Sequence, residues 1–237
     1  MIRLIDEAFR PWDIFSARVL AAYRSYDDTL CWVATDGKNA APTAVCSIVD
    51  GFAILSAKEE ADWEELTGFL RMQPWKQLHC NANIAKKLPY PIEWTSILVK
   101  LTAPLSPDPR PLTPASDPGK VYDILACCFP DIKNRNDWMA DLALRWRRGT
   151  ARSWVIENAC TASALAITEN YAFLGALGTL PEARGKGLAG KLLARIAMEL
   201  GGRKIWLSCR EELRGFYESI GFKKMGEMIT LHKEADV

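Results

Sequence analysis

Prolines crowd the middle of this 237-residue chain. Six of them fall between Thr102 and Gly119, at positions 104, 107, 109, 111, 114 and 118. Proline lacks a backbone N–H and its ring fixes φ, so neither a helix nor a strand ladder continues through such a segment. An extended connector is expected there instead. The chain is therefore predicted to form two small domains, at residues 1–101 and 110–237, joined by a proline-rich linker at 102–109.

The composition is that of a globular protein with a buried core, since 49% of the residues are hydrophobic and 25% are charged. The formal net charge of +1 gives no long-range attraction to nucleic acid or to an anionic membrane. Charges at Arg3, Asp6, Glu7 and Arg10 interrupt the apolar core that a signal peptide would need. No later run is long and apolar enough to span a bilayer. We therefore expect neither nucleic acid nor a membrane as a partner.

Cysteine and histidine usage argues against disulfides and metal sites. The seven cysteines are an odd number and lack the paired spacing of metal ligands, so a reducing cytoplasm is the simplest setting. Only two histidines are present, His79 and His232, which leaves little for a histidine-based metal site or for Ser–His–Asp catalysis. No metal is expected.

Hydrophobic periodicity predicts an α+β order in the first half. The expected helices are 17–26, 62–69 and a short one near 83–87, and the expected strands are 31–35, 43–50, 52–57, 75–80 and 94–102. Asp50-Gly51 separates two apolar, β-branched runs and predicts a hairpin turn. Asp62 stands where a helix N-cap is needed.

The second half repeats this order. Helices are expected at 121–128, 137–147, 188–200 and 211–220, and strands at 153–157, 162–169, 172–180, 205–209 and 227–232. Four leucines, Ile196 and Ala197 recur along one face of 188–200, and Gly201-Gly202 ends that helix. The likeness of the two halves suggests two copies of one fold.

A glycine-rich turn lies between the predicted strand 172–180 and the helix 188–200. It reads Leu-Pro-Glu-Ala-Arg-Gly-Lys-Gly-Leu-Ala-Gly over residues 180–190. The first N–H groups of a helix have no internal partners and face a positive dipole, so small residues there let a pyrophosphate approach. Arg184 and Lys186 would add positive charge. Such turns also serve simple chain reversal.

Two other nucleotide motifs do not fit this turn. A P-loop needs Ser or Thr after its Gly-Lys pair, and here Gly187 follows Lys186. A dinucleotide fingerprint needs a third glycine in register and an early β-α-β unit, and neither is present.

Two motifs together resemble the GNAT (Gcn5-related N-acetyltransferase) superfamily over residues 110–237. Arg184-x-x-Gly187-x-Ala189 is similar to the acyl-CoA signature of that family, Arg/Gln-x-x-Gly-x-Gly/Ala. Residues 216–222, Phe-Tyr-Glu-Ser-Ile-Gly-Phe, are similar to its Phe-Tyr-x-x-x-Gly-Phe segment. They occur in the family's order and on the expected elements. The resemblance implies an α+β, GNAT acyl-CoA N-acyltransferase fold with a mixed sheet, in tandem with a degenerate copy at 1–101.

The resemblance also implies where acetyl-CoA binds. Backbone groups of Leu177, Thr179 and Leu180 on a splayed strand would pair with the pantetheine amides, as an added strand does. The pyrophosphate would lie against the amides of the following turn, at Arg184, Gly185, Lys186, Gly187, Leu188, Ala189 and Gly190. Arg210 stands where relatives often carry an asparagine that contacts the cofactor, which leaves that contact in doubt.

For catalysis, the resemblance makes Tyr217 the general acid that protonates the departing thiolate, whose pKa is about 8.5. Packing against Phe216 and Phe222 is the other interpretation of Tyr217. The strand 172–180 contains no carboxylate, so no general base is identified; Glu157, Glu169 and Glu182 are candidates only by their places near strand ends. A water relay or an amine that arrives deprotonated would serve as well.

The expected function is transfer of acetyl from acetyl-CoA to a primary amine by direct attack. The alternatives are a CoA-binding or regulatory module without turnover, and transfer of a longer acyl group. The helical segment 121–148 would form part of the acceptor site. Residues 1–101 lack the Arg-x-x-Gly-x-Gly/Ala signature, and carboxylates follow the strand 52–57 instead. A monomer and a homodimer are both compatible with a tandem chain.

Overall fold

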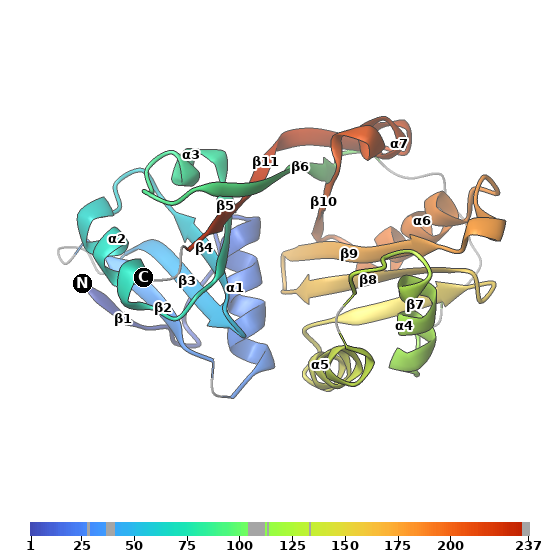
Figure 1. Ribbon diagram of the computed structural model, residues 1–237, viewed down its shortest axis with the longest axis horizontal. Coiled ribbons are helices and arrows are strands. Elements are labelled where there is room, and N and C mark those ends of the chain that lie inside the picture. The colour runs from blue at the N-terminus through green and yellow to red at the C-terminus, as the bar shows by residue number, and fades with distance from the viewer. Residues whose placement is uncertain (28, 37–40, 104–111, 113, 133, 234–237) are drawn as a thin grey trace. The chain divides into compact units, whose positions relative to one another are not determined.

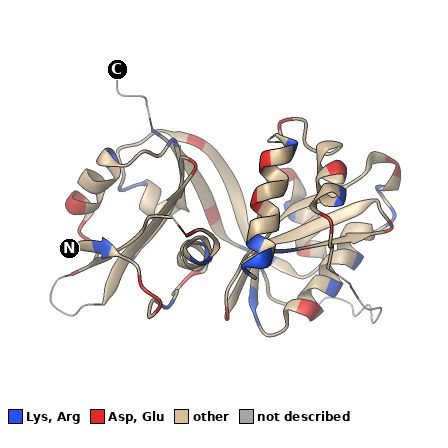
Figure 2. Ribbon diagram, turned by 90° about the horizontal axis from the view of Figure 1, so that it is seen from below, with Lys and Arg blue, Asp and Glu red and all other residues tan. Residues whose placement is uncertain are grey.

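The computed structural model describes residues 1–27, 29–36, 41–103, 112, 114–132 and 134–233. The chain forms two compact units (Figure 1). The first comprises Met1–Leu98, Cys209–Glu211 and Met225–Val237, and the second comprises Val99–Ser208 and Glu212–Lys224. Most of the predicted linker at 102–109 lies outside the described residues. Acidic and basic residues are interspersed over the elements of each unit (Figure 2), in agreement with the net charge of +1.

The elements of the first half follow the predicted order. They are β1 Ile2–Leu4, α1 Ile14–Ser25, β2 Cys31–Thr35, β3 Pro42–Val49, β4 Phe52–Ala57, α2 Trp63–Met72, β5 Gln77–Asn81, α3 Ala82–Ala85 and β6 Ile92–Leu101. Asp50 and Gly51 both have positive φ, at 50° and 76°, so they form the hairpin turn that an Asp-Gly pair favours. The Asp62 side chain accepts a hydrogen bond of 2.9 Å from the Glu65 amide, and it caps α2 as predicted. Strand β1 was not expected, because three residues are too few to show an alternating pattern.

Five strands of the first unit lie next to one another in the sheet, in the order β1-β2-β3-β4-β5. Neighbouring strands are antiparallel except β4 and β5, which are parallel and are joined through α2. Side chains alternate between two cores, as the period of a strand requires. Val33 and Val45 contact residues of α1 in one core, whereas Cys46 and Leu55 contact residues of α2 in the other.

From its first strand onward, the second half has the order of strands and helices that the first half has from β2 onward. Its elements are α4 Pro118–Ala126, α5 Arg135–Arg147, β7 Arg152–Ile156, β8 Cys160–Ile167, β9 Tyr171–Thr179, α6 Leu188–Leu200, β10 Lys204–Cys209, α7 Arg214–Ser219 and β11 Phe222–His232. Short 3₁₀ turns lie at Pro181–Ala183 and Glu211–Leu213, so the predicted helix at 211–220 is in fact a turn followed by α7. Strands β7, β8 and β9 are antiparallel, and β9 and β10 are parallel and joined through α6. This repeats the topology of β2 to β5.

Strand β11 is longer than the predicted 227–232, and its C-terminal part belongs to the first unit. It pairs antiparallel with β5, from Met228 opposite Asn81 to His232 opposite Gln77. Ile229 and Leu231 are buried in the same core as Leu78 of β5. Strand β11 therefore extends the sheet of the first unit beyond β5, and β6 follows it in the strand order.

Candidate functional site

The parallel strands β9 and β10 diverge before they end. Their paired residues run from Tyr171 opposite Lys204 to Leu174 opposite Leu207. Beyond this point β9 continues to Thr179 and pairs with β8 alone among the described strands. The segment Gly175–Thr179 consequently presents one edge on which a ligand can form backbone hydrogen bonds.

A β-bulge lies at the point of divergence. Thr161 of β8 is opposite Gly178, whereas Ser163 is opposite Gly175, so β9 holds one residue more than β8 between these pairs. Ala176, within the bulge, has φ of +49°, which is a strained conformation for a residue with a side chain. The sequence pattern did not predict this bulge, and the one signal for it is the pair of flanking glycines, Gly175 and Gly178.

The three strand residues expected to bind pantetheine are half-buried, and their backbone groups differ in availability. The Thr179 carbonyl already accepts hydrogen bonds from Arg184 Nε at 3.1 Å and from Cys128 Sγ at 3.4 Å. The Leu180 amide donates to the Ala159 carbonyl at 2.8 Å. These bonds engage the Thr179 carbonyl and the Leu180 amide, whereas Leu177 lies at the bulge, between the paired residues Gly175 and Gly178.

The turn before α6 has the backbone that the glycine pattern predicts. Gly185 and Gly187 have φ of +75° and +72°, which favour glycine at both positions, and Gly187 is the N-cap of α6. A Cβ built at either glycine would meet no atom within 4 Å, so the space before these amides is open. No side chain caps α6. The amides of residues 188–190 are therefore left for an anion, since the first intrahelical donor is the amide of Lys191, to Gly187 O at 3.1 Å.

The side chains around this turn divide into exposed cations and small or buried residues. Arg184 and Lys186 are exposed, Leu188 is buried, and Ala189 and Gly190 are half-buried. A Cβ at Gly190 would lie 3.8 Å from Ile220 Cγ2, which is ordinary contact. The predicted cradle residues thus form one continuous open turn with positive charge at its rim.

Tyr217 lies on α7 and is 6% exposed. Its ring contacts Phe216 and Phe222 edge-on, with centroids 5.1 and 5.8 Å away. These contacts fix the ring, so the packing and the catalytic interpretations of Tyr217 are compatible. Glu157, Glu169 and Glu182 are all exposed, and none is distinguished as a base.

The corresponding place in the first unit is built differently. Strands β4 and β5 are paired only from Phe52–Gln77 to Ile54–His79, so they also diverge. However, the start of α2 carries the Asp62 carboxylate on its amides, where an anion would have to bind. A pocket of about 390 Å³ opens beside the strand ends. It is lined by lysines, asparagines and neighbouring residues, namely Ala57, Lys58, Glu59, Trp63, Asn81, Asn83, Ile84, Lys86 and Lys87.

Neither a metal site nor a membrane-spanning helix is present among the described residues. No three His, Cys, Asp or Glu side chains gather as a metal site would require. No described helix is long and apolar enough to cross a membrane.

Part of the second unit matches a known family. Residues 149–224 match the family model of an acetyltransferase (GNAT) domain. A search of curated proteins finds no significant match.

Solved structures resemble the whole chain in fold. A GNAT-family acetyltransferase from Colwellia psychrerythraea is 12% identical, with 99% of this chain and 100% of that chain covered and a TM-score of 0.53. A GCN5-related N-acetyltransferase from Sphaerobacter thermophilus is 15% identical, with coverage of 100% and 97% and a TM-score of 0.56. A tandem GNAT protein from the clavulanic acid biosynthesis pathway is 12% identical, with coverage of 94% and 88% and a TM-score of 0.57. At these identities the likeness concerns the fold alone.

Proposed function

From the match of residues 149–224 to an acetyltransferase (GNAT) domain, we propose that the protein transfers acetyl from acetyl-CoA to a primary amine by direct attack. The fold of the whole chain is that of tandem GNAT proteins. One observation carries the proposal: strands β9 and β10 diverge, and α6, the helix that joins them, begins with open N-terminal amides. An extended arm with a pyrophosphate at its end has the shape that such a site fits.

In this proposal the backbone does most of the binding. Leu177 at the bulge would form hydrogen bonds with the pantetheine arm. The open amides at Gly187 and in the first turn of α6 would hold the pyrophosphate. Lys186 would add a positive charge, while Arg184, through its hydrogen bond to the Thr179 carbonyl, ties the turn to the end of β9.

Tyr217 is the proposed general acid. A phenol donates a proton to a thiolate at small cost, because its ordinary pKa of about 10 is close to that of a thiol. The aromatic contacts of Tyr217 would hold its ring in one orientation. The chain offers no carboxylate on β9, so the amine would arrive deprotonated or lose its proton to water.

The same missing carboxylate favours a second candidate function, a CoA-binding module without turnover. Both functions need the cradle, and they differ only in acyl transfer. Transfer of a longer acyl group uses the same site. The proposed location is the cytoplasm, because the odd number of cysteines does not suit a disulfide framework.

Calorimetric titration of acetyl-CoA into the full chain and into Gly187→Glu tests the cradle. The glutamate would place a carboxylate against the pyrophosphate and disturb the amides that bind it. Hydrogen bonds to charged groups contribute roughly 1.5–3 kcal/mol each, so losing two weakens binding at least about 100-fold.

Gly202→Glu is the matched control. Gly202 follows the other end of α6, has φ of +69°, and also has nothing within 4 Å of a built Cβ. Both variants thus add a carboxylate and a similar backbone strain to the same helix. Equal weakening in both variants, or no binding to the unmodified chain, would contradict the proposal. Binding that is lost only in Gly187→Glu leads to a screen of amines for release of the CoA thiol, which separates the enzyme from the non-catalytic module.

A further inference from the structure

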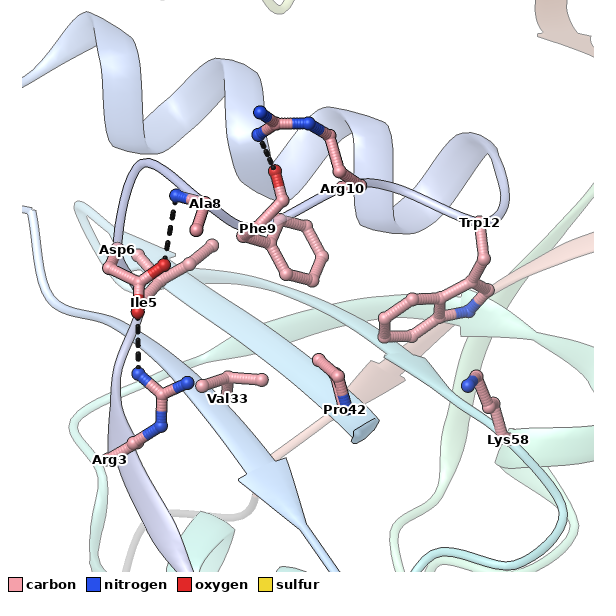
Figure 3. A pocket seen from close by; sticks show the side chains of 10 residues that line it. All are labelled: Arg3, Ile5, Asp6, Ala8, Phe9, Arg10, Trp12, Val33, Pro42 and Lys58. Carbon is pink, nitrogen blue, oxygen red and sulfur yellow. Dashed lines mark hydrogen bonds and ion pairs between the residues drawn. The ribbon is translucent and has the colours of Figure 1, made fainter. Parts of the chain in front are cut away.

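A pocket of about 410 Å³ lies within the first unit, beside the segment that joins β1 to α1 (Figure 3). Its other walls come from Val33 on β2, Pro42 on β3 and Lys58 directly after β4. This volume falls in the range of small-molecule sites, which is roughly 300–1,000 Å³. The pocket shares no lining residue with the glycine-rich turn at 180–190, so binding of a ligand here does not depend on acyl transfer.

The floor of the pocket is apolar and firmly packed. Ile5, Phe9 and Val33 are buried, and they belong to the same core as residues of α1. The rings of Phe9 and Trp12 contact each other edge-on, with centroids 5.6 Å apart and planes at 74°. Aromatic surfaces of this kind favour a flat apolar ligand, whose ring can stack on them or meet their edges.

The rim of the pocket is positively charged. Arg3, Arg10 and Lys58 line it, and Asp6 is the one carboxylate among the lining residues. Asp6 is already engaged by Arg3 at 2.8 Å and by the Ala8 amide at 3.0 Å. Since this pair is neutral, the charges left to a ligand are those of Arg10 and Lys58.

These two cations are held in place without a carboxylate partner among the described residues. Lys58 Nζ lies 5.2 Å from the centre of the Trp12 ring. Arg10 Nη1 donates to the backbone carbonyls of Glu7 at 2.8 Å and Phe9 at 3.0 Å. Figure 3 shows Lys58 and Trp12 at one end of the pocket and the Arg3–Asp6 pair at the other, with Val33 between them.

We propose that this pocket binds a small carboxylate with a planar apolar body, an aryl carboxylate. The ring of the ligand packs against Phe9, Trp12 and Val33, and its carboxylate pairs with Lys58. A cationic ligand would be repelled by the positive charges of Arg10 and Lys58. A sugar or a free phosphate would place polar atoms against the apolar floor of the pocket. An aryl carboxylate buries its ring on the apolar floor and pairs its charge with the positive rim.

Titration of the full chain with 1-naphthoate, with binding measured by ligand-observed NMR, tests this assignment. Its neutral analogue 1-naphthamide has the same ring and no charge. We expect the carboxylate to bind at least about tenfold more tightly than the amide, because a charged hydrogen bond contributes more than a neutral one. Lys58→Gln should remove this preference and leave binding of the amide unchanged, and Lys58→Arg should keep it. Trp12→Leu should weaken both ligands.

Two control variants locate the binding. Lys86→Gln alters the neighbouring pocket, which Lys58 also lines, and Lys186→Gln alters the turn before α6. Neither should change the affinity for 1-naphthoate by more than about twofold. If Lys58→Gln does not fold, as judged by its thermal midpoint, Arg10→Gln provides the second test and should weaken 1-naphthoate severalfold. The proposal is overturned by equal binding of the two ligands, by no binding, or by loss of binding in either control variant.

Discussion

Leu231 stands near the end of the chain, yet its side chain is fully buried, with 0% exposure. It lies on β11 opposite Leu78 of β5 and belongs to the core that α2 and α3 cover. A residue in a loosely attached terminal strand could be truncated at almost no cost. A residue that fills the core of the N-terminal unit could not. Leu231→Ala therefore measures how firmly β11 is integrated into that unit.

The expected cost follows from the atoms that are removed. The substitution deletes three carbon positions, each worth about 0.8 kcal/mol when buried, which gives roughly 2.4 kcal/mol. Incomplete collapse of the surrounding sheet adds a cavity term, and measured costs of such truncations span about 2–5 kcal/mol. We expect about 3 kcal/mol of unfolding free energy, which is a factor of more than 100 in the folding equilibrium.

Urea unfolding of the full chain gives this free energy, and amide hydrogen exchange in β5 shows which unit is affected. Met225→Ala is the matched control, because Met225 lies on the same strand and is 52% exposed. It should cost less than about 0.5 kcal/mol. A loss below 1 kcal/mol for Leu231→Ala, with protection in β5 unchanged, would refute the integration of β11 into the first unit.

Three further predictions concern the second unit and a buried histidine. Tyr217→Phe keeps the ring contacts and removes the proton, so kcat should fall by about 100-fold or more while calorimetry finds the affinity for acetyl-CoA unchanged. A Cβ at Gly178 would lie 3.1 Å from a cysteine sulfur and 3.2 Å from a leucine methyl, so Gly178→Ala should cost about 1–2 kcal/mol by thermal unfolding, whereas the open Gly190→Ala should cost almost nothing. Burial and a nearby arginine lower the pKa of His79 to about 3, so the unfolded chain takes up a proton below pH 6.5 that the folded chain does not. Stability should therefore fall by about 1–2 kcal/mol between pH 6.5 and 5, an effect that His79→Gln abolishes in urea titrations and that His232→Gln, at an exposed position, retains.

Elements whose signals are local could be predicted from the sequence. The Asp50-Gly51 turn, the Asp62 cap and the helix 188–200 each depend on residues within a few positions of one another, and each is confirmed. The pairing of β11 with β5 depends on residues about 150 positions apart. The apolar pattern predicts a strand there, but it contains no information about which strand is its neighbour, so the composition of the two units required the structure.

The candidate site was predictable to a similar degree. The turn at 184–190 was found because left-handed backbone requires glycine, and this leaves a visible pattern. The bulge at Ala176 was missed because alanine is not a residue that indicates positive φ. The bonds that engage Thr179 and Leu180 were also missed, since they come from the distant positions Cys128 and Ala159 as well as from the nearby Arg184.

The two units have the same strand topology, and only a few residues at the start of a helix distinguish an open anion site from a capped helix. Both have a parallel pair of strands that diverges ahead of a helix. Before α6, glycines at positive φ keep side chains away from the amides and no carboxylate caps them. Before α2, Asp62 supplies that carboxylate from within the chain, and the positive charge nearby comes from lysine side chains instead of amides. A pyrophosphate at the start of α2 would have to displace the Asp62 carboxylate from the helix amides, so acyl-CoA binding is expected in the second unit alone. To create such a site in the first unit, both the removal of Asp62 and new glycines in the turn would be required.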